Sequence, residues 1–68
     1  MKARKLLAAN LRRLRRAKGI SQEELAHQAD LDRTYVSSLE RSVYAASVDA
    51  IEKLAAALQV EPADLLKP

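Results

Sequence analysis

Residues 21–41, "SQEELAHQADLDRTYVSSLER", contain two short helical patterns with almost no sequence between them. Ser21 predicts the N-cap of the first helix, because a serine side chain accepts a hydrogen bond from the backbone of the first turn. Glu24 follows three residues later and completes the capping-box pattern. Leu25 and Ala29 lie four residues apart, which predicts that they share the inward face of this helix.

The connection between the two predicted helices is only a few residues long, which is typical of a two-helix motif. Asp30 is one of the few non-glycine residue types that tolerate a left-handed backbone, and Asp32 is a favourable N-cap for the second helix. Val36 and Leu39 predict the inward face of that second helix. Two helices joined by a turn of about three to four residues form a helix-turn-helix, which allows the second helix to enter the DNA major groove.

The second helix carries short polar residues where a buried helix would carry leucine or isoleucine. These residues are Arg33, Thr34, Ser37 and Ser38. Arginine can donate two hydrogen bonds to guanine O6 and N7, and short hydroxyl side chains let the backbone approach the groove floor. The Tyr35 hydroxyl can reach a phosphate. The alternative for all of these residues is an ordinary solvated helix face, with Tyr35 partly packed.

The flanking sequence predicts three further helices. Leu7, Leu11 and Leu14 share a helical stripe within about residues 3–18, and Gly19 is a C-terminal stop. Residues 42–46 predict a loop, and Ser47 predicts the N-cap of a helix whose stripe is Ile51, Leu54, Ala55 and Leu58. Pro62 favours the first turn of a short last helix, "PADLLK". The sequence therefore predicts an all-α, compact five-helix bundle forming a single domain over residues 1–68.

The charge is distributed unevenly along the chain. Residues 1–20 contain eight lysines and arginines and no acid, whereas residues 21–68 contain four basic and nine acidic residues. A basic segment of this density can bind DNA, RNA or an acidic membrane surface, and it can equally be a solvated helix face. The membrane alternative is weak because the apolar stripe of this helix is needed for the core.

Several function classes lack the residues that they need. The chain has no cysteine, one histidine (His27) and one glycine, so we expect no metal site, no cofactor and no glycine-rich phosphate loop. Glu23 and Glu24 are explained by helix capping, and no serine has a plausible base partner. We therefore expect no enzyme and no small-molecule substrate. No apolar run is long enough for a membrane span, and the basic start does not predict a signal peptide.

The stretch "LRRLRRAKGISQEELAHQADLDRTYVSSLER" and the later "LAAALQVEPADLL" resemble the Xre/Cro–repressor type of helix-turn-helix proteins, typified by the lambdoid phage repressors. The resemblance implies a lambda repressor-like fold with the motif at about residues 21–41. It implies base-reading positions at Asp32, Arg33, Thr34, Ser37 and Ser38. It also implies phosphate contacts, for which the candidates are Gln22, Tyr35 and Arg41, and a structural ion pair between Arg15 and Glu40.

Two positions depart from the family pattern. Asp30 occupies the turn position that is usually glycine. The family usually reads "ERG" after the second helix, whereas this chain reads "ERSVYAAS", with Ser42 in place of the glycine. Because that loop often contacts the DNA backbone or the dimer partner, its phosphate contacts are not carried over to this chain. Tyr44 is a candidate for a replacement contact or for part of a partner surface.

These observations predict a sequence-specific double-stranded DNA-binding transcriptional regulator in the cytoplasm, associated with the nucleoid. Small members of the family include phage repressors, restriction–modification controllers and antitoxin-like regulators, and many act as homodimers on inverted repeats. Val60, Leu65 and Leu66 are candidates for the dimer interface, and they can instead close the core of the monomer. The alternative function is a protein-interaction module that retains the fold without reading DNA.

Overall fold

The computed structural model describes residues 2–68. The helices are α1 (Lys2–Ala17), α2 (Gln22–Ala29), α3 (Arg33–Glu40) and α4 (Val48–Leu58), followed by the 3-10 helix η1 (Pro62–Leu65). The all-α prediction is correct. The prediction of a fifth α-helix is wrong, because the segment after Pro62 forms a single 3-10 turn. No helix within residues 2–68 is both long enough and apolar enough to cross a bilayer.

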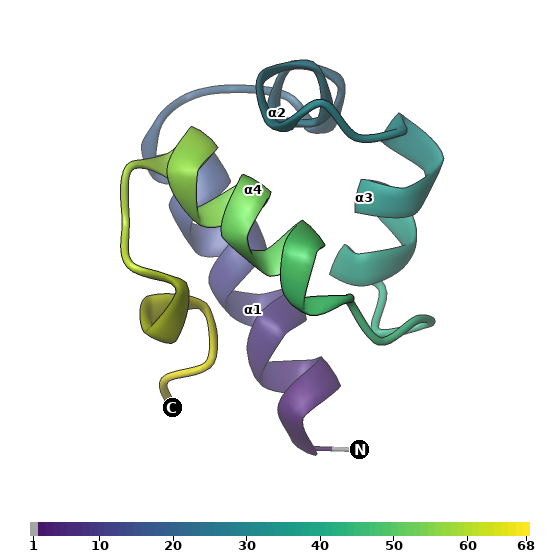
Figure 1. The fold of residues 1–68 in the computed structure, drawn as a ribbon, viewed down its shortest axis with the longest axis vertical. Helices are drawn as coiled ribbons and strands as arrows, with labels where there is room; N and C mark the ends of the chain where they lie inside the picture. The colour runs from purple at the N-terminus through teal and green to yellow at the C-terminus, as the bar shows by residue number, and fades with distance from the viewer. Residues whose placement is uncertain (1) are drawn as a thin grey trace.

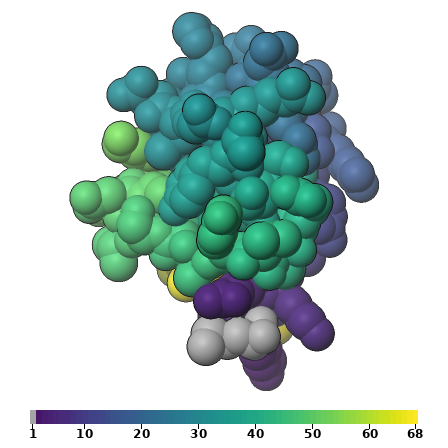
Figure 2. All heavy atoms as spheres, turned by 90° about the vertical axis from the view of Figure 1, so that its right-hand side faces the viewer, coloured from purple at the N-terminus to yellow at the C-terminus, as the bar shows by residue number. Residues whose placement is uncertain are grey.

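The helices pack around α1, which runs through the length of the molecule (Figure 1). The α2 helix packs against both α3 and α4, while α1 contacts α3 and η1. The α3 helix lies at the edge of the molecule in Figure 1, and turning that edge toward the viewer shows its side chains on the surface (Figure 2). The helix-turn-helix therefore presents one side of its second helix to solvent.

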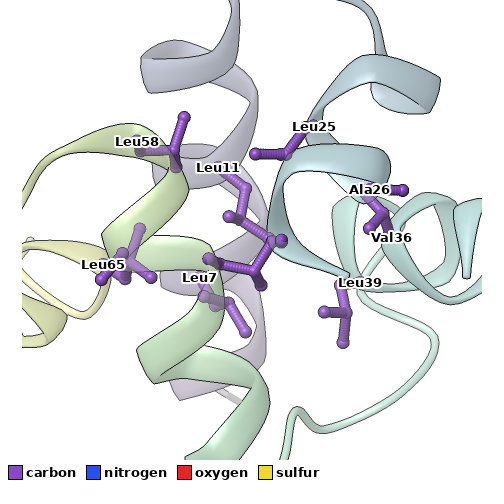
Figure 3. Packing of buried hydrophobic residues seen from close by; sticks show 11 residues of the cluster. Leu7, Leu11, Leu25, Ala26, Val36, Leu39, Leu58 and Leu65 are labelled. Atoms are coloured by element: carbon purple, nitrogen blue, oxygen red, sulfur yellow. The ribbon is translucent and has the colours of Figure 1, made fainter. Parts of the chain in front are cut away.

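The core is aliphatic and receives side chains from every element. Leucines and small side chains from α1, α2, α3, α4 and η1 converge between the helices (Figure 3). Leu11, Leu25, Leu39, Leu54 and Leu65 are among its largest fully buried side chains. Each such leucine contributes roughly 1.5–3 kcal/mol by leaving water. Because small domains are only marginally stable, each of these side chains is a large fraction of the net stability.

Leu65 has a structural role in the monomer. Its side chain is fully buried in the core, which is the second of the two roles that the sequence left open for this residue. Val60 is half-buried and packs against the same core, while Leu66 is exposed. Of the three apolar candidates near the end of the chain, Leu66 is thus the one that the monomer leaves accessible.

Three of the four α-helices begin at the N-caps that the sequence predicted. The Ser21 Oγ accepts from the Glu24 N–H at 3.0 Å, and the Asp32 Oδ1 accepts from the Thr34 N–H at 2.7 Å. The Ser47 Oγ accepts from the N–H of the third helical residue at 3.1 Å. The Glu24 carboxylate is turned toward Gln28, whereas a reciprocal capping box is found at the start of η1.

A buried asparagine joins α1 to the C-terminal end of the chain. Asn10 lies in the middle of α1 and is buried. Its Nδ2 donates to the carbonyl oxygens of Leu65 and Lys67, both at 2.9 Å. Carbonyls at the end of a helical turn lack intrahelical partners, so a buried side-chain donor compensates for their loss of water. Asn10 therefore holds the segment after η1 against α1.

Backbone conformations with positive φ occur at three residues other than glycine. They are Asp30 (φ 56°), Ser42 (φ 62°) and Gln59 (φ 59°). Asp30 ends α2 in the left-handed region, as the sequence predicted. Ser42 follows α3, and this is the position at which the resembling family has glycine. The Cβ of serine makes this conformation unfavourable, so the turn after α3 is strained locally.

We predict that Ser42→Gly stabilises the fold. Relief of the left-handed strain, roughly 1–2 kcal/mol, exceeds the entropy that glycine adds to the unfolded chain, roughly 0.4–1 kcal/mol. The free energy of unfolding should therefore rise by about 0.5–1 kcal/mol in urea denaturation. Asp30→Gly is the matched control and should gain less, because aspartate tolerates this backbone better than serine does. A lower urea midpoint for Ser42→Gly would contradict the strain assignment.

Candidate nucleic-acid interface

The outward side of α3 is polar. Arg33, Thr34 and Arg41 are exposed and Ser37 is half-exposed, whereas Val36 on the opposite side is fully buried. Since a helix turns about 100° per residue, the four polar residues fall on one contiguous strip. The helix is thus divided into a side that packs and a side that is available for hydrogen bonding.

Ser38 does not lie on this strip. It is only 4% exposed, and its carbonyl oxygen accepts from the Val43 N–H at 3.0 Å, where the chain turns back after Ser42. Ser38 therefore does not share the exposed strip with Arg33 and Thr34, and its base-reading role stays a prediction.

Asp32 begins α3 and is exposed. One carboxylate oxygen is used as the N-cap, through the hydrogen bond from the Thr34 N–H. The other oxygen remains free to accept, for example from a cytosine amino group. Asp32 thus combines a local structural role with a position at the start of α3 beside Arg33.

Glu40, at the end of α3, is the centre of a buried hydrogen-bonding network. Its side chain is only 2% exposed, and the guanidinium of Arg15 on α1 contacts it in the bidentate manner. The Nε of Arg15 donates to Oε2 at 2.7 Å, and the Nη2 donates to Oε1 at 3.0 Å. Arg12, one turn earlier on α1, donates to the Glu40 backbone carbonyl. The structure thus brings together the two residues of the expected ion pair.

The same network reaches the start of α2. Arg15 Nη1 donates to the Ile20 carbonyl oxygen at 3.0 Å, just before the N-cap of α2. Gln22, the first residue of α2, donates from Nε2 to the Glu40 Oε1 at 3.1 Å. The second N–H of this amide is available to an acceptor outside the network. Because the backbone N–H groups of the first turn of a helix also point outward, this end of α2 suits an anionic group.

The network shifts the ionisation of its two charged members. Burial raises the pKa of the Glu40 carboxyl, but the hydrogen bonds from Arg15 and Gln22 outweigh it, and the pKa lies below its usual value. The hydrogen bond to Glu40 raises the pKa of the Arg15 guanidinium. Both groups are therefore charged at neutral pH, and each depends on the other for its desolvation to be tolerated.

Tyr35 is tied to the segment that follows α3. Its ring packs against the core, and its hydroxyl oxygen accepts from the Ser47 N–H at 3.2 Å. The hydroxyl hydrogen remains available for donation to a phosphate. The sequence did not indicate this contact, because nothing local shows that residues 35 and 47 meet.

Many basic residues of α1 and of the turn that follows it form hydrogen bonds within the chain. Arg12, Arg13, Arg15 and Lys18 each donate at least one hydrogen bond within the chain, Lys18 to the Ala57 carbonyl oxygen at 3.1 Å. Half of the eight basic residues in positions 1–20 thus have structural partners. The charge of this segment therefore does not by itself define a polyanion-binding surface.

Comparison with known proteins identifies the family. The Helix-turn-helix family model matches residues 11–65. A hypothetical transcription factor from Neisseria meningitidis is 54% identical over 65 residues, covering 96% of this chain, and the chain spans only 61% of that relative's length. The control protein C.BamHI from Bacillus amyloliquefaciens is 47% identical over 64 residues, covering 93% of this chain and 79% of the relative.

Solved structures agree with the sequence comparison. The crystal structure of a hypothetical transcription factor from Neisseria matches with a TM-score of 0.94 and 53% identity, covering 97% of this chain and 76% of that one. The restriction-modification controller protein C.AhdI from Aeromonas hydrophila matches with a TM-score of 0.88 and 47% identity, covering 91% of this chain and 94% of that one. The matched family consists of DNA-binding regulators rather than enzymes.

We predict that Glu40→Gln destabilises the fold by about 1.5–3 kcal/mol at pH 7, because it leaves the half-buried Arg15 guanidinium without its counter-charge. Since the folded-state pKa of Glu40 is lowered, its contribution is complete above the ordinary glutamate pKa and is lost as the pH falls through the folded value. The difference in unfolding free energy between wild type and Glu40→Gln should therefore narrow as the pH falls below about 4.3, the ordinary glutamate pKa.

Urea denaturation monitored by circular dichroism at several pH values provides the measurement. Glu23→Gln is the matched control, because Glu23 is an exposed carboxylate on the first turn of α2. Its effect should stay below about 1 kcal/mol. Equal losses for the two variants, or a difference independent of pH, would contradict the assigned role of Glu40.

Proposed function

The chain belongs to the Xre-type family of helix-turn-helix transcriptional regulators, and we propose that it is a sequence-specific reader of double-stranded DNA. The observation that carries the proposal is the polar strip of α3, which is accessible while Val36, Leu39 and Glu40 of the same helix are buried. Arg33, Thr34 and Ser37 would contact base edges, and Asp32 would do so through its free carboxylate oxygen. We propose residues 1–68 as one DNA-binding domain.

Phosphate contacts would fix the position of α3 in the groove. Gln22 would hold one phosphate with the amide N–H that Glu40 does not use, and Arg41 and the Tyr35 hydroxyl would hold others. Support for Gln22 comes from its place at the start of α2 and from its hydrogen bond to Glu40, which fixes the amide. Because these contacts go to the DNA backbone, they orient the protein without specifying sequence.

The regulator would act as a homodimer on an inverted repeat, with its two α3 helices one DNA turn apart. The relatives C.BamHI and C.AhdI are, by their names, control proteins, and the latter is a restriction-modification controller. We propose the same class of role for this chain, in the cytoplasm, where a bacterial nucleoid is accessible.

Arg33→Ala should weaken binding to the preferred site by about 1–3 kcal/mol and relax specificity at one base pair in each half-site. The reason is the loss of a bidentate contact that only guanine supplies. Selection of bound sites from random duplex DNA, at near-physiological salt and with both proteins in parallel, measures this effect. An equal loss on preferred and random DNA would show that Arg33 contacts phosphate.

Gln22→Ala should weaken binding to preferred and random duplexes by similar factors, because a phosphate contact carries no sequence information. Gln28→Ala is the matched control on the same helix, since Gln28 is exposed and bonds to Glu24. Fluorescence anisotropy with labelled duplexes compares the three proteins. A loss confined to the preferred site would place Gln22 among the base-reading residues.

The protein-interaction module is the second candidate. The acidic balance of residues 21–68 and the atypical segment after Glu40 favour it. The selection experiment separates the two functions, because a module that does not read DNA would enrich no motif and show no salt-dependent binding.

A further inference from the structure

We propose that the protein binds a small organic acid, with a single ring and a carboxylate, in a hollow between α1 and α4. The ring would fill the apolar interior of the hollow, and the carboxylate would bind Arg4, which also lines it. The proposal goes beyond DNA reading and does not rest on it, because no residue of the polar strip of α3 lines the hollow within residues 2–68.

The hollow forms where distant parts of the chain meet. The start of α1 and the segment after η1 lie at the same end of the molecule (Figure 1). The hollow has a volume of about 140 Å³. A wall built from apolar side chains favours an apolar group over water. Six such side chains line it: Ala3 and Leu7 on α1, Ala45 and Ala46 after α3, Ile51 on α4, and Leu66 after η1.

The volume of the hollow suits one ring. An apolar cavity of roughly 150 Å³ stays dry and binds benzene. The hollow is of similar size, so fused rings or a long chain would project from it into water. We therefore expect the apolar part of the bound molecule to be a single six-membered ring.

Arg4 is the charged side chain among the described residues that line the hollow. Its Nε is buried and has no hydrogen-bond partner within residues 2–68, although buried donors are almost always paired. Residues 1–20 contain no acid, so no carboxylate of α1 can serve as the acceptor. A buried donor in this state indicates an acceptor that the bound molecule supplies.

A carboxylate is the acceptor that best matches a guanidinium. It can accept two parallel hydrogen bonds, from Nε and one Nη, which adds direction as well as affinity. Arg15 donates to Glu40 in this manner within the same chain. The start of α1 also favours an anion, because the N-terminal end of a helix carries partial positive charge and this first turn has no acidic residue.

Other small molecules satisfy only one of the two features. Water would pair with the Arg4 Nε but would gain nothing from the apolar wall. A hydrocarbon would fill the hollow and leave the Nε unpaired. An inorganic anion such as phosphate would bind Arg4 and leave the hollow empty. A ring that carries a carboxylate satisfies both features, and benzoate is the simplest molecule of this class.

Titration of the isotope-labelled full chain with benzoate, followed by NMR, tests the proposal. Amide signals of residues 3–7, 45–46 and 66 should shift together, with a dissociation constant of about 1 mM or lower. Benzyl alcohol has the same ring without the charge, and it should bind about tenfold more weakly or worse, because hydrogen bonds to charged groups are the stronger ones.

Arg4→Gln removes the cation of the site. It should raise the dissociation constant for benzoate by about tenfold or more. Lys5→Gln is the matched control, because it removes the same charge from an exposed neighbour that does not line the hollow. The control should change the constant by less than about twofold, since an exposed charge contributes little.

Ala3→Leu fills the hollow from the first turn of α1. The added apolar atoms would take the place of the ring, so benzoate should bind about tenfold more weakly or worse. Ala9→Leu is the matched control, because Ala9 is exposed on the same helix and lies outside the hollow. Leucine favours helices, so both variants should keep α1 intact.

Circular dichroism checks that all four variants fold. Wild-type protein that binds benzoate more weakly than about 10 mM would overturn the proposal. So would equal affinities for benzoate and benzyl alcohol, or equal effects of Arg4→Gln and Lys5→Gln. Shifts centred on the first turn of α2, beside Gln22, would also overturn it, because they would place the carboxylate at the expected phosphate contact. Binding is measured on the protein alone, so none of these outcomes depends on whether the chain reads DNA.

Discussion

The ion pair between Arg15 and Glu40 is the interaction on which the arrangement of the helix-turn-helix depends. Helices of eight residues are too short to hold their positions by themselves, so contacts with α1 must place α2 and α3. The pair joins α1 to the end of α3, and its neighbours Ile20 and Gln22 extend the network to the start of α2. One carboxylate thus sets the positions of both helices of the motif.

The aliphatic core and this network act on different properties of the fold. The leucines stabilise by leaving water, which is non-directional and tolerates small shifts of one helix against another. The bidentate contact of Arg15 is directional and loses its value when the groups separate. Because a buried ion pair gains little net stability over an apolar pair, its contribution here is better described as orientation of α3.

Local chemistry made part of this structure predictable from sequence. Ser21, Asp32 and Ser47 cap helices within three residues of themselves, and Asp30 takes the backbone that its residue type allows. The contacts of Asn10 depend on carbonyls more than fifty residues away, so no local pattern indicates them. The burial of Ser38 depends on where the chain turns after α3, which hydroxyl content alone cannot show. The resemblance, rather than periodicity, indicated that Arg15 and Glu40 meet.

Because α3 is divided into a packing side and a polar side, the DNA sequence that such a domain binds can change without disturbing the core. Arg33, Thr34 and Ser37 contribute nothing to the core, so substitutions there cost little stability and alter only what the strip can bind. Gln22 and Glu40 differ from the residues of the strip, because the carboxylate that fixes the Gln22 amide also neutralises the half-buried Arg15. A substitution at Glu40 would disturb phosphate positioning and folding together. Substitutions on the polar strip can therefore change DNA specificity at little cost to stability. The orientation of the strip, in contrast, depends on contacts that also stabilise the fold.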